Sequence, residues 1–134
     1  MKRNITRIGC GAAIIEGGKI LLLKRRRTPE SGHWGIPGGK VDWMEPVEHA
    51  VCREVQEETG LTLKDIKLIG IVDQLDKDKC EHWIAAVYIA NAFTGVPQIL
   101  EPEKHKEMGW FDLRDLPQPL TQATKNTLPA LLNL

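Results

Sequence analysis

The sequence predicts one mixed α/β domain, residues 1–134, in which helices pack against a sheet. Three observations support this class. Apolar runs of strand length alternate with two helical patterns in the order β, β, α, β, β, β, α. No stretch rich in Gly, Ser or Pro divides the chain as a linker would, and no repeat is present. At 134 residues, the chain is long enough to bury one core without disulfides or metal staples.

The first half of the chain opens with a hairpin and leads into one strongly predicted helix. Residues 6–16 and 19–24 are apolar runs around EGGK, whose two glycines suit a tight turn. Residues 26–39 read as a loop, because prolines and glycines interrupt any regular element. Pro46 suits the first turn of a helix and Gly60 its C-cap, so the predicted helix covers residues 46–59.

The second half predicts a run of strands and a closing helix. Strands are expected at residues 66–74, 82–91 and 107–112, the middle one rich in Ile, Val, Ala and Tyr. The last helix is expected at residues 121–132, where Pro129 would kink it.

Composition and charge narrow the class of partner. The chain is 42% apolar and 27% charged, as is ordinary for soluble globular proteins, and no apolar run approaches the length of a membrane span. Lys plus Arg equals Asp plus Glu, at 18 each, so the chain lacks the positive field that long nucleic acids require. Three cysteines without metal-type spacing fit free thiols, and no signal peptide is evident. We therefore expect a cytoplasmic protein that binds neither membrane nor long nucleic acid.

The predicted helix carries an unusual group of acidic residues. Its apolar residues fall on one side when drawn at about 100° per residue: Val47, Ala50, Val51 and Val55. Glu54, Glu57 and Glu58 project within roughly the same arc, so they are predicted to point inward. A solvated acidic face is the alternative reading, but it would expose Val47 and Val51 as well. Burying unpaired carboxylates costs several kcal/mol per ion, so something positive must compensate.

A divalent cation is the predicted compensating charge. Arg53 can neutralise one carboxylate, but a single guanidinium leaves an excess of negative charge. Carboxylate oxygens without a nearby pair of thiols select a hard ion, Mg²⁺ or Mn²⁺, which is normally shared with waters and substrate phosphates.

The spacing of these residues resembles the Nudix box of the Nudix hydrolases. Five residues separate its Gly from its first Glu, and seven separate that Glu from Arg-Glu. The positions that match are Gly39, Glu45, Arg53, Glu54, Val55, Glu57, Glu58, Gly60 and Leu61. The stretches ILLLKRR, HWGIPGG and EPEKHKEMGWFDLRDLP extend the similarity to small MutT-type members over most of the chain.

The resemblance implies a fold and a reaction. The fold is an α/β/α sandwich, with a mixed sheet, the catalytic helix on one face and the C-terminal helix on the other. The reaction is the hydrolysis, by water and with Mg²⁺ or Mn²⁺, of nucleoside diphosphates linked to another group.

The resemblance also implies roles for individual residues. Glu57 and Glu58 would bind metal together with the Gly38 carbonyl, and Glu54 would act as general base or as a metal ligand. Arg53 would orient Glu54 or Glu57, so the expected catalytic residues are Glu54, Arg53 and Glu57. Positions expected to be structural are Gly39, Glu45 and Gly60, with Glu45 bracing the loop against the helix.

Further site residues are expected outside the box. Many family members add a carboxylate from a later loop, and Glu103 is predicted to supply it, in preference to Glu101 and Glu107. A merely solvated loop is the alternative. Arg25 resembles a position that contacts nucleotide phosphate. Trp34 and Trp83 are both candidates to stack on a base, with Trp34 taken as the predicted contact, although core packing is the usual role of a tryptophan.

Substrate specificity is inferred from missing signatures. The region about fifteen residues after the box has no proline of the ADP-ribose type, and no SQPWPFP-like stretch is present. The expected activity is therefore hydrolysis of a nucleoside triphosphate, including oxidised or non-standard ones, to a monophosphate and pyrophosphate. ADP-ribose or another nucleoside diphosphate derivative is the alternative, and a nucleotide-sensing module without catalysis is a further one. The sequence leaves monomer and homodimer open.

Overall fold

The described part of the chain folds into two helices and nine strands. The structure, a computed structural model, describes residues 4–134. In chain order its elements are β1 Thr6–Glu16, β2 Lys19–Arg25, β3 Trp34–Gly35, β4 Gly38–Lys40, α1 Val47–Thr59, β5 Thr62–Lys64, β6 Lys67–Asp76, β7 Glu81–Ala90, β8 Ala92–Thr94, β9 His105–Asp112 and α2 Gln122–Leu132. Neither helix within residues 4–134 is long and apolar enough to cross a membrane.

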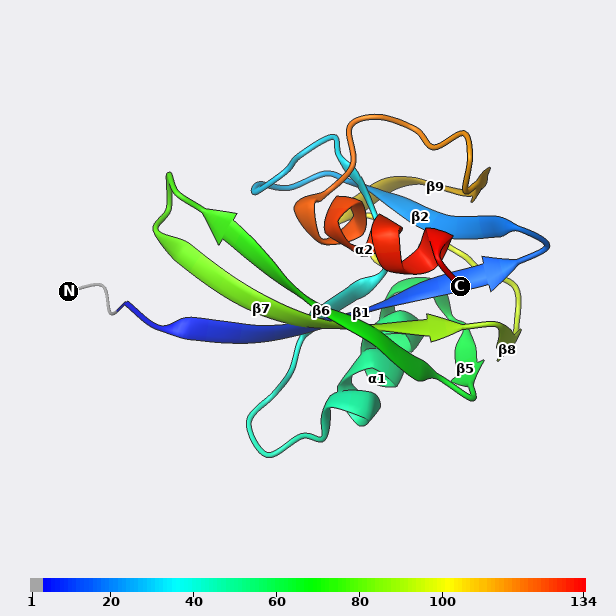
Figure 1. Ribbon diagram of the computed structural model, residues 1–134, viewed down its shortest axis with the longest axis horizontal. Helices are drawn as coiled ribbons and strands as arrows, with labels where there is room; N and C mark the ends of the chain where they lie inside the picture. Colours follow the sequence, from blue (N-terminus) through cyan, green and yellow to red (C-terminus); the bar gives the residue numbers. More distant parts are fainter. Residues whose placement is uncertain (1–3) are drawn as a thin grey trace.

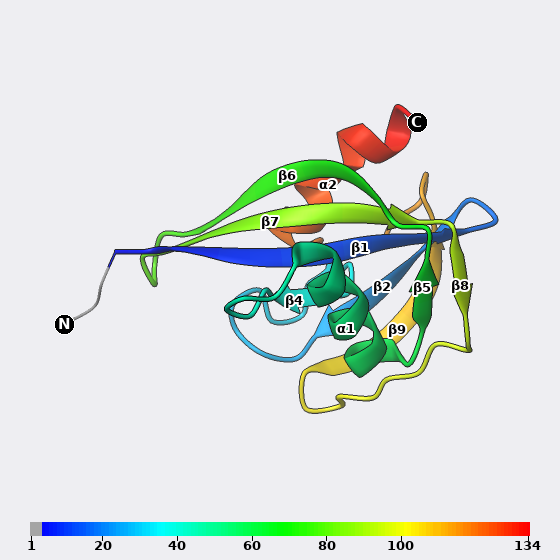
Figure 2. The ribbon, with the colours of Figure 1, turned by 90° about the horizontal axis from the view of Figure 1, so that it is seen from below.

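The main sheet is mixed and lies between the two helices. Its strand order is β3-β2-β1-β7-β6, with β4 pairing with β1 and β9 pairing with β2. The long pairing of β1 with β7 is parallel, whereas their other pairings in this sheet are antiparallel. A small second sheet joins β5 to β8. Figures 1 and 2 show α1 on one side of the main sheet and α2 on the other. The predicted α/β/α sandwich is confirmed.

Alternating side chains divide the core between these two sides. On β1, Ala12 and Ile14 belong to the cluster that packs against Val51 and Val55 of α1. Ala13, between them, belongs to the cluster beneath α2. Because successive residues of a strand point to opposite faces, one buried strand can supply both cores. The two helices therefore pack on opposite faces of the same sheet.

The ends of α1 follow the predicted signals. Pro46 is the N-cap, one residue earlier than the first helical position predicted for it. Gly60 ends the helix with a φ of 80°, and its N–H donates to the Gln56 carbonyl. This left-handed conformation is readily accessible to glycine. Helix α2 begins after Thr121, whose side chain accepts a hydrogen bond from the Thr124 N–H, and it contains Pro129.

The glycine-rich segment before α1 is more regular than predicted. It was expected to be a loop, but it contributes the short strands β3 and β4. In β4, Gly38 lies opposite Gly11 and Gly39 opposite Cys10 of β1. A Cβ at Gly38 would collide with the Cys10 carbonyl, so this close pairing requires glycine. The segment is thereby fixed beside α1.

Candidate active site

The acidic residues of α1 differ in burial. Glu58 is 5% exposed, and the Glu54 side chain is 13% exposed. Both side chains therefore face the protein body, as the helical pattern predicts. The Glu57 side chain is 49% exposed and lies at the edge of this group, which is less buried than predicted.

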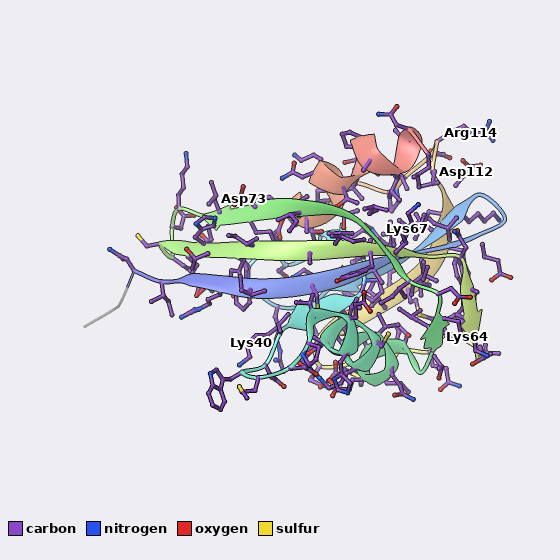
Figure 3. The ribbon with its side chains drawn as sticks, turned by 60° about the horizontal axis from the view of Figure 1, so that its bottom comes forward. Lys40, Lys64, Lys67, Asp73, Asp112 and Arg114 are labelled. Atoms are coloured by element: carbon purple, nitrogen blue, oxygen red, sulfur yellow. The ribbon has the colours of Figure 1, made fainter. Side chains whose placement is uncertain are left out.

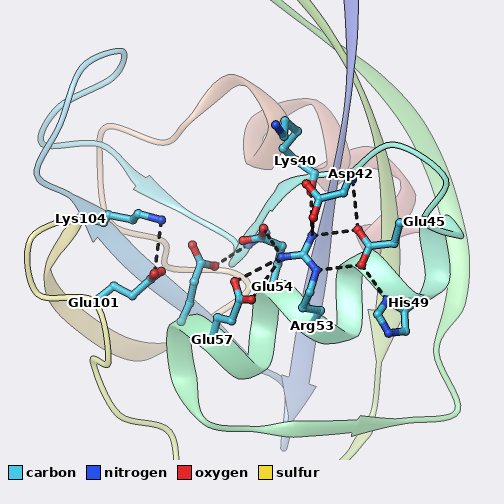
Figure 4. A network of polar contacts seen from close by, with 11 residues as sticks. Lys40, Asp42, Glu45, His49, Arg53, Glu54, Glu57, Glu101 and Lys104 are labelled. Atoms are coloured by element: carbon cyan, nitrogen blue, oxygen red, sulfur yellow. Dashed lines mark hydrogen bonds and ion pairs between the residues drawn. The ribbon is translucent and has the colours of Figure 1, made fainter.

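Arg53 joins the acidic residues to the loop before the helix (Figure 4). Its Nε and Nη2 donate to the two carboxylate oxygens of Glu45, at 2.8 and 2.9 Å. Its Nη1 donates to Glu54 at 2.9 Å and to Glu57 at 3.3 Å. Nη2 also donates to the Lys40 carbonyl at 3.1 Å. One guanidinium thus uses its fixed fork of donors to hold three carboxylates in place.

Glu45 is the anchor of this network. Its carboxylate accepts the bidentate pair from Arg53, and it also contacts His49 Nδ1 at 2.6 Å. The Asp42 N–H donates to the same side chain at 3.1 Å. Hydrogen bonding from Arg53 is the main cause that lowers the pKa of Glu45 to about 2. These contacts are those expected of a residue that braces the loop against the helix.

Glu58 is a buried carboxylate with little local compensation. The Gly38 N–H donates to its Oε1 at 2.8 Å. Burial is the largest cause that raises the pKa of Glu58 to about 8, and repulsion by Glu54 and Glu101 contributes to the same shift. Burial also raises the pKa of Glu54, although Arg53 opposes the effect. Both pKa shifts indicate that the protein alone does not offset the cost of ionising these two carboxylates.

The loop after β8 closes one side of this acidic site. The Leu100 N–H donates to the Glu58 carbonyl at 3.1 Å, which holds the loop against the end of α1. Glu101 then lies beside the acidic residues, and its Oε2 is 3.3 Å from Lys104 Nζ (Figure 4). Its Oε1 is buried without a hydrogen-bond partner among residues 4–134. Glu103, the residue predicted to act here, is exposed. The geometry thus favours Glu101 over Glu103.

A large cavity of about 860 Å³ opens beside the acidic site. Its lining includes Glu58, Gly38 and Gly39 at one side, and Arg25, which was predicted to contact phosphate. Strands β1 and β7 contribute small residues to its floor, together with Trp83.

The predicted aromatic contact, Trp34, is not among the residues that line this cavity. Its ring packs edge-on against Phe111, with ring centroids 4.9 Å apart, in the core beneath α2. Its position in a two-residue strand that pairs with β2 explains this placement. Trp83 is the tryptophan that faces the cavity.

His105 is a site residue that sequence reasoning missed. It lines the cavity, is 6% exposed, and has its Nε2 3.6 Å from Glu58 Oε2. Its Nδ1 has no hydrogen-bond partner within the described chain. Burial, with Arg25 and Lys104 nearby, lowers the pKa of His105 to about 4, so the ring is neutral at pH 7. No motif marks this histidine, because its burial depends on how β9 pairs with β2.

The residues present fit a hard divalent cation. No group of three or more His, Cys, Asp or Glu side chains in the described part of the chain is arranged to hold a metal ion by itself. Buried carboxylate oxygens nevertheless converge here, and Glu101 Oε1 is an orphaned acceptor. Mg²⁺ commonly uses one or two carboxylates and completes its shell with waters and substrate phosphates. The carboxylate oxygens of this site, which the protein only partly compensates, match that mode of Mg²⁺ binding.

The class of this protein follows from a mixed sheet enclosed by two helices and a buried helix carboxylate, Glu58, that lines a large cavity. The chain belongs to the Nudix family, because the family model described as the NUDIX domain matches residues 6–131. A solved structure, described as a MutT NUDIX hydrolase from Burkholderia pseudomallei, is 56% identical with a TM-score of 0.93. The similarity covers 95% of this chain and 98% of that one.

Curated relatives carry names that differ in substrate. A protein of Methanocaldococcus jannaschii named ADP-ribose pyrophosphatase is 41% identical over 100 residues, or 75% of this chain. A Mycobacterium tuberculosis protein named putative 8-oxo-dGTP diphosphatase 2 is 40% identical over 115 residues. That match covers 84% of this chain and 77% of the relative. The chain spans 58% of the length of the M. jannaschii protein.

Proposed function

We propose that this protein hydrolyses a nucleoside triphosphate, including oxidised or non-standard ones, to a monophosphate and pyrophosphate with Mg²⁺ or Mn²⁺. One observation carries the proposal: Glu58, a buried carboxylate near the end of α1, lines the 860 Å³ cavity. A cavity of this size accommodates a nucleotide. The relative named putative 8-oxo-dGTP diphosphatase 2 supports this substrate class.

We assign the following roles in the reaction to the residues of the site. Glu57, Glu58 and the Gly38 carbonyl would hold the cation, with Glu101 or Glu103 as the loop carboxylate. A bound cation would neutralise the phosphate charge and orient the anhydride. Glu54 would take the proton of the attacking water or serve as a further ligand. Arg53 would fix the direction of Glu54, since its Nη1 lies 2.9 Å from Glu54 Oε1.

The nucleotide itself would lie across the cavity. Arg25 lines the cavity and would bind phosphate, because a guanidinium matches phosphate geometry. Trp83 would contact the base, a role predicted for Trp34 and now better supported for Trp83 by its place in the cavity lining. The partner is thus a small nucleotide. We propose a cytoplasmic setting, which the free thiols of Cys10, Cys52 and Cys80 support.

ADP-ribose is the second candidate substrate. The observation that favours it is the name of the M. jannaschii relative, which is 41% identical. A nucleoside diphosphate sugar presents the same anhydride to the acidic helix, so the two candidates differ only in what fills the rest of the cavity.

A substrate panel tests the proposal. The purified chain with Mg²⁺ would be incubated with the common nucleoside triphosphates, 8-oxo-dGTP and ADP-ribose, and the products separated by chromatography. We expect pyrophosphate from a triphosphate, and ¹⁸O from labelled water will identify the phosphorus attacked. Turnover of ADP-ribose and of no triphosphate would mean that ADP-ribose, not a nucleoside triphosphate, is the substrate. Binding without any turnover would favour a nucleotide sensor.

A matched pair of variants tests the site. Glu58→Gln is expected to lower kcat/KM by about 100-fold or more, because the site loses a carboxylate that would bind the cation. Glu48→Gln makes the same change on an exposed part of α1 and is expected to have little effect. Equal activity of the two variants would remove Glu58 from the site. Mn²⁺ binding to Glu54→Gln separates the two roles of Glu54, since a general base can be lost without losing the ion.

A further inference from the structure

Three consecutive arginines, residues 25–27, lie in different surroundings. Arg25 lines the cavity, and Arg27 is exposed. The Arg26 side chain reaches the loop before β9, where its Nε donates to the Pro102 carbonyl at 2.9 Å. Since 76 positions separate these two residues, the local sequence does not reveal the contact.

The backbone of Arg26 binds two loops. Its N–H donates to the Lys104 carbonyl at 2.8 Å, in the same loop as Pro102. Its carbonyl accepts a hydrogen bond from Ser31 Oγ at 3.1 Å, in the loop before β3. Arg26 therefore links the end of β2 to the loops that precede β3 and β9.

The loop before β3 is a firm support, because α2 holds its other side. The Glu30 carboxylate accepts a hydrogen bond from the Gln122 N–H at 2.8 Å. The Gln122 side-chain amide in turn donates to the Leu75 carbonyl and accepts from the Leu75 N–H of β6, both at 3.0 Å. Arg26 thus connects the loop before β9 to a part of the fold that is fixed to the main sheet.

The loop before β9 is a tight turn whose first residue is Glu101. The Glu101 carbonyl accepts hydrogen bonds from the Lys104 N–H at 2.9 Å and from the His105 N–H at 3.1 Å. On the other side of the turn, the Leu100 N–H donates to the Glu58 carbonyl at 3.1 Å. Because both sides of the turn are bonded, the backbone of Glu101 has a defined position relative to α1.

The Glu101 carboxylate has an oxygen available for a ligand. Its Oε2 is 3.3 Å from Lys104 Nζ (Figure 4). Its Oε1 is buried and has no hydrogen-bond partner among residues 4–134. A buried carboxylate oxygen without a partner is costly, and a hard divalent cation is a ligand that such an oxygen prefers.

The pairing of β9 with β2 is irregular next to this turn. Arg25 lies opposite His105, and Lys106 is left as an extra residue at a bulge. A bulge disrupts the ladder locally. The two bonds from Arg26 follow this bulge directly, so they fix the turn where the ladder does not.

We propose that Arg26 is a positioning residue for Glu101: through its bonds to the turn, it holds the Glu101 carboxylate where that carboxylate binds the divalent cation of the acidic site. This role rests on the proposed function, because it requires a cation at the site. Arg26 is not among the residues that line the cavity, so it acts through the turn. Fixing a ligand before the ion arrives lowers the cost of binding.

Mn²⁺ binding to the full chain, followed by electron paramagnetic resonance of the free ion, tests this role. Arg26→Ala is expected to weaken binding by about 3- to 10-fold, the effect of losing one hydrogen bond. Loss of a positive charge alone would strengthen the binding of a cation, so weaker binding indicates a positional effect. Arg26→Gln is expected to recover most of the affinity, because its Nε2 is as many bonds from Cα as the Arg26 Nε.

A double-mutant cycle tests whether Arg26 acts through Glu101. Glu101→Gln is expected to weaken Mn²⁺ binding by at least as much as Arg26→Ala, and adding Arg26→Ala to it should have little further effect. Arg114→Ala is the matched control, because the Arg114 Nε donates to Asp112 at 3.3 Å at the opposite end of β9. Figure 3 shows both residues on the opposite side of the molecule from Lys40, which precedes the loop into α1.

An Arg26→Ala variant that binds Mn²⁺ as wild type does would overturn this role. Independent effects of Arg26→Ala and Glu101→Gln, or a wild type that does not bind Mn²⁺, would overturn it as well. The substrate panel decides the activity separately: a chain that binds Mn²⁺ through Arg26 and Glu101 but cleaves no nucleotide would keep this role and lose the proposed function. Circular dichroism establishes that each variant is folded. If Arg26→Ala does not fold, Arg26→Met, which keeps an apolar stem and lacks the donor, takes its place.

Discussion

The carboxylate of Glu54 lies directly against the backbone of Gly39. A Cβ at Gly39 would occupy the space of that carboxylate, so any side chain there would displace the glutamate that we propose as general base or metal ligand. The link joins two ends of one motif, since Gly39 belongs to β4 and Glu54 to the middle of α1. The observed position of Glu54 therefore depends on the absence of a side chain at Gly39.

Gly39→Ala is expected to lower kcat by about 10- to 100-fold, because a displacement of about 1 Å of a reacting group has effects of that size. The measurement is steady-state kinetics on the substrate that the panel identifies. Gly70→Ala is the control, because a Cβ there meets nothing within 4 Å. If the two variants are equally active, Gly39 does not fix the position of Glu54.

Glu45→Gln is expected to destabilise the fold in a pH-dependent manner. Arg53 lowers the pKa of Glu45 in the folded protein from 4.5 to about 2. When folding lowers the pKa of a carboxyl, the folded state gains free energy of unfolding at pH values above the unfolded-state pKa. This gain is lost as the pH falls toward the folded-state pKa. The difference in free energy of unfolding between wild type and variant should therefore narrow below about pH 4.5, as measured by urea unfolding. A difference that stays constant from pH 7 to pH 3 would contradict the ion pair as its cause.

Arg25→Ala is expected to raise KM by about 10-fold with a smaller change in kcat, because a residue that holds the substrate phosphates contributes mainly to binding. Arg25 lines the cavity, whereas Arg27, two residues later, is exposed and does not. Arg27→Ala is therefore the control. Should both variants behave like wild type, the phosphates bind elsewhere in the cavity.

Substitution of Trp34 is expected to affect stability, whereas substitution of Trp83 is expected to affect substrate binding. Trp34→Ala should lower the free energy of unfolding by about 2–3 kcal/mol, because its ring packs against Phe111 in the core. Trp83→Ala should raise KM by about 5- to 150-fold, the range for loss of one stacked base. Thermal unfolding and kinetics on both variants make the comparison. The reverse pattern would restore Trp34 as the base contact.

Local signals predicted the helix and its acidic face well. Pro46 and Gly60 act at the helix ends, and the alternation of Val51 and Val55 with Glu54 and Glu58 indicated which side is buried. These features depend on residues close together in the chain, where helical periodicity applies.

The parts of the site that the sequence did not predict depend on distant contacts. Glu101 reaches the acidic site because Leu100 bonds to the Glu58 carbonyl, across 42 positions. His105 becomes buried through the pairing of β9 with β2. Nothing in the local pattern distinguishes Glu101 from Glu103, or Trp83 from Trp34. The position of each side chain depends on which distant strand or loop packs beside it.

The Gln122 side chain that bonds to both the N–H and the carbonyl of Leu75 has a consequence for the behaviour of the protein in concentrated solution. Two backbone groups of an outer strand that would otherwise template intermolecular β-structure are occupied by an amide from the same molecule. A single glutamine thus blocks intermolecular strand pairing at this position of the β6 edge.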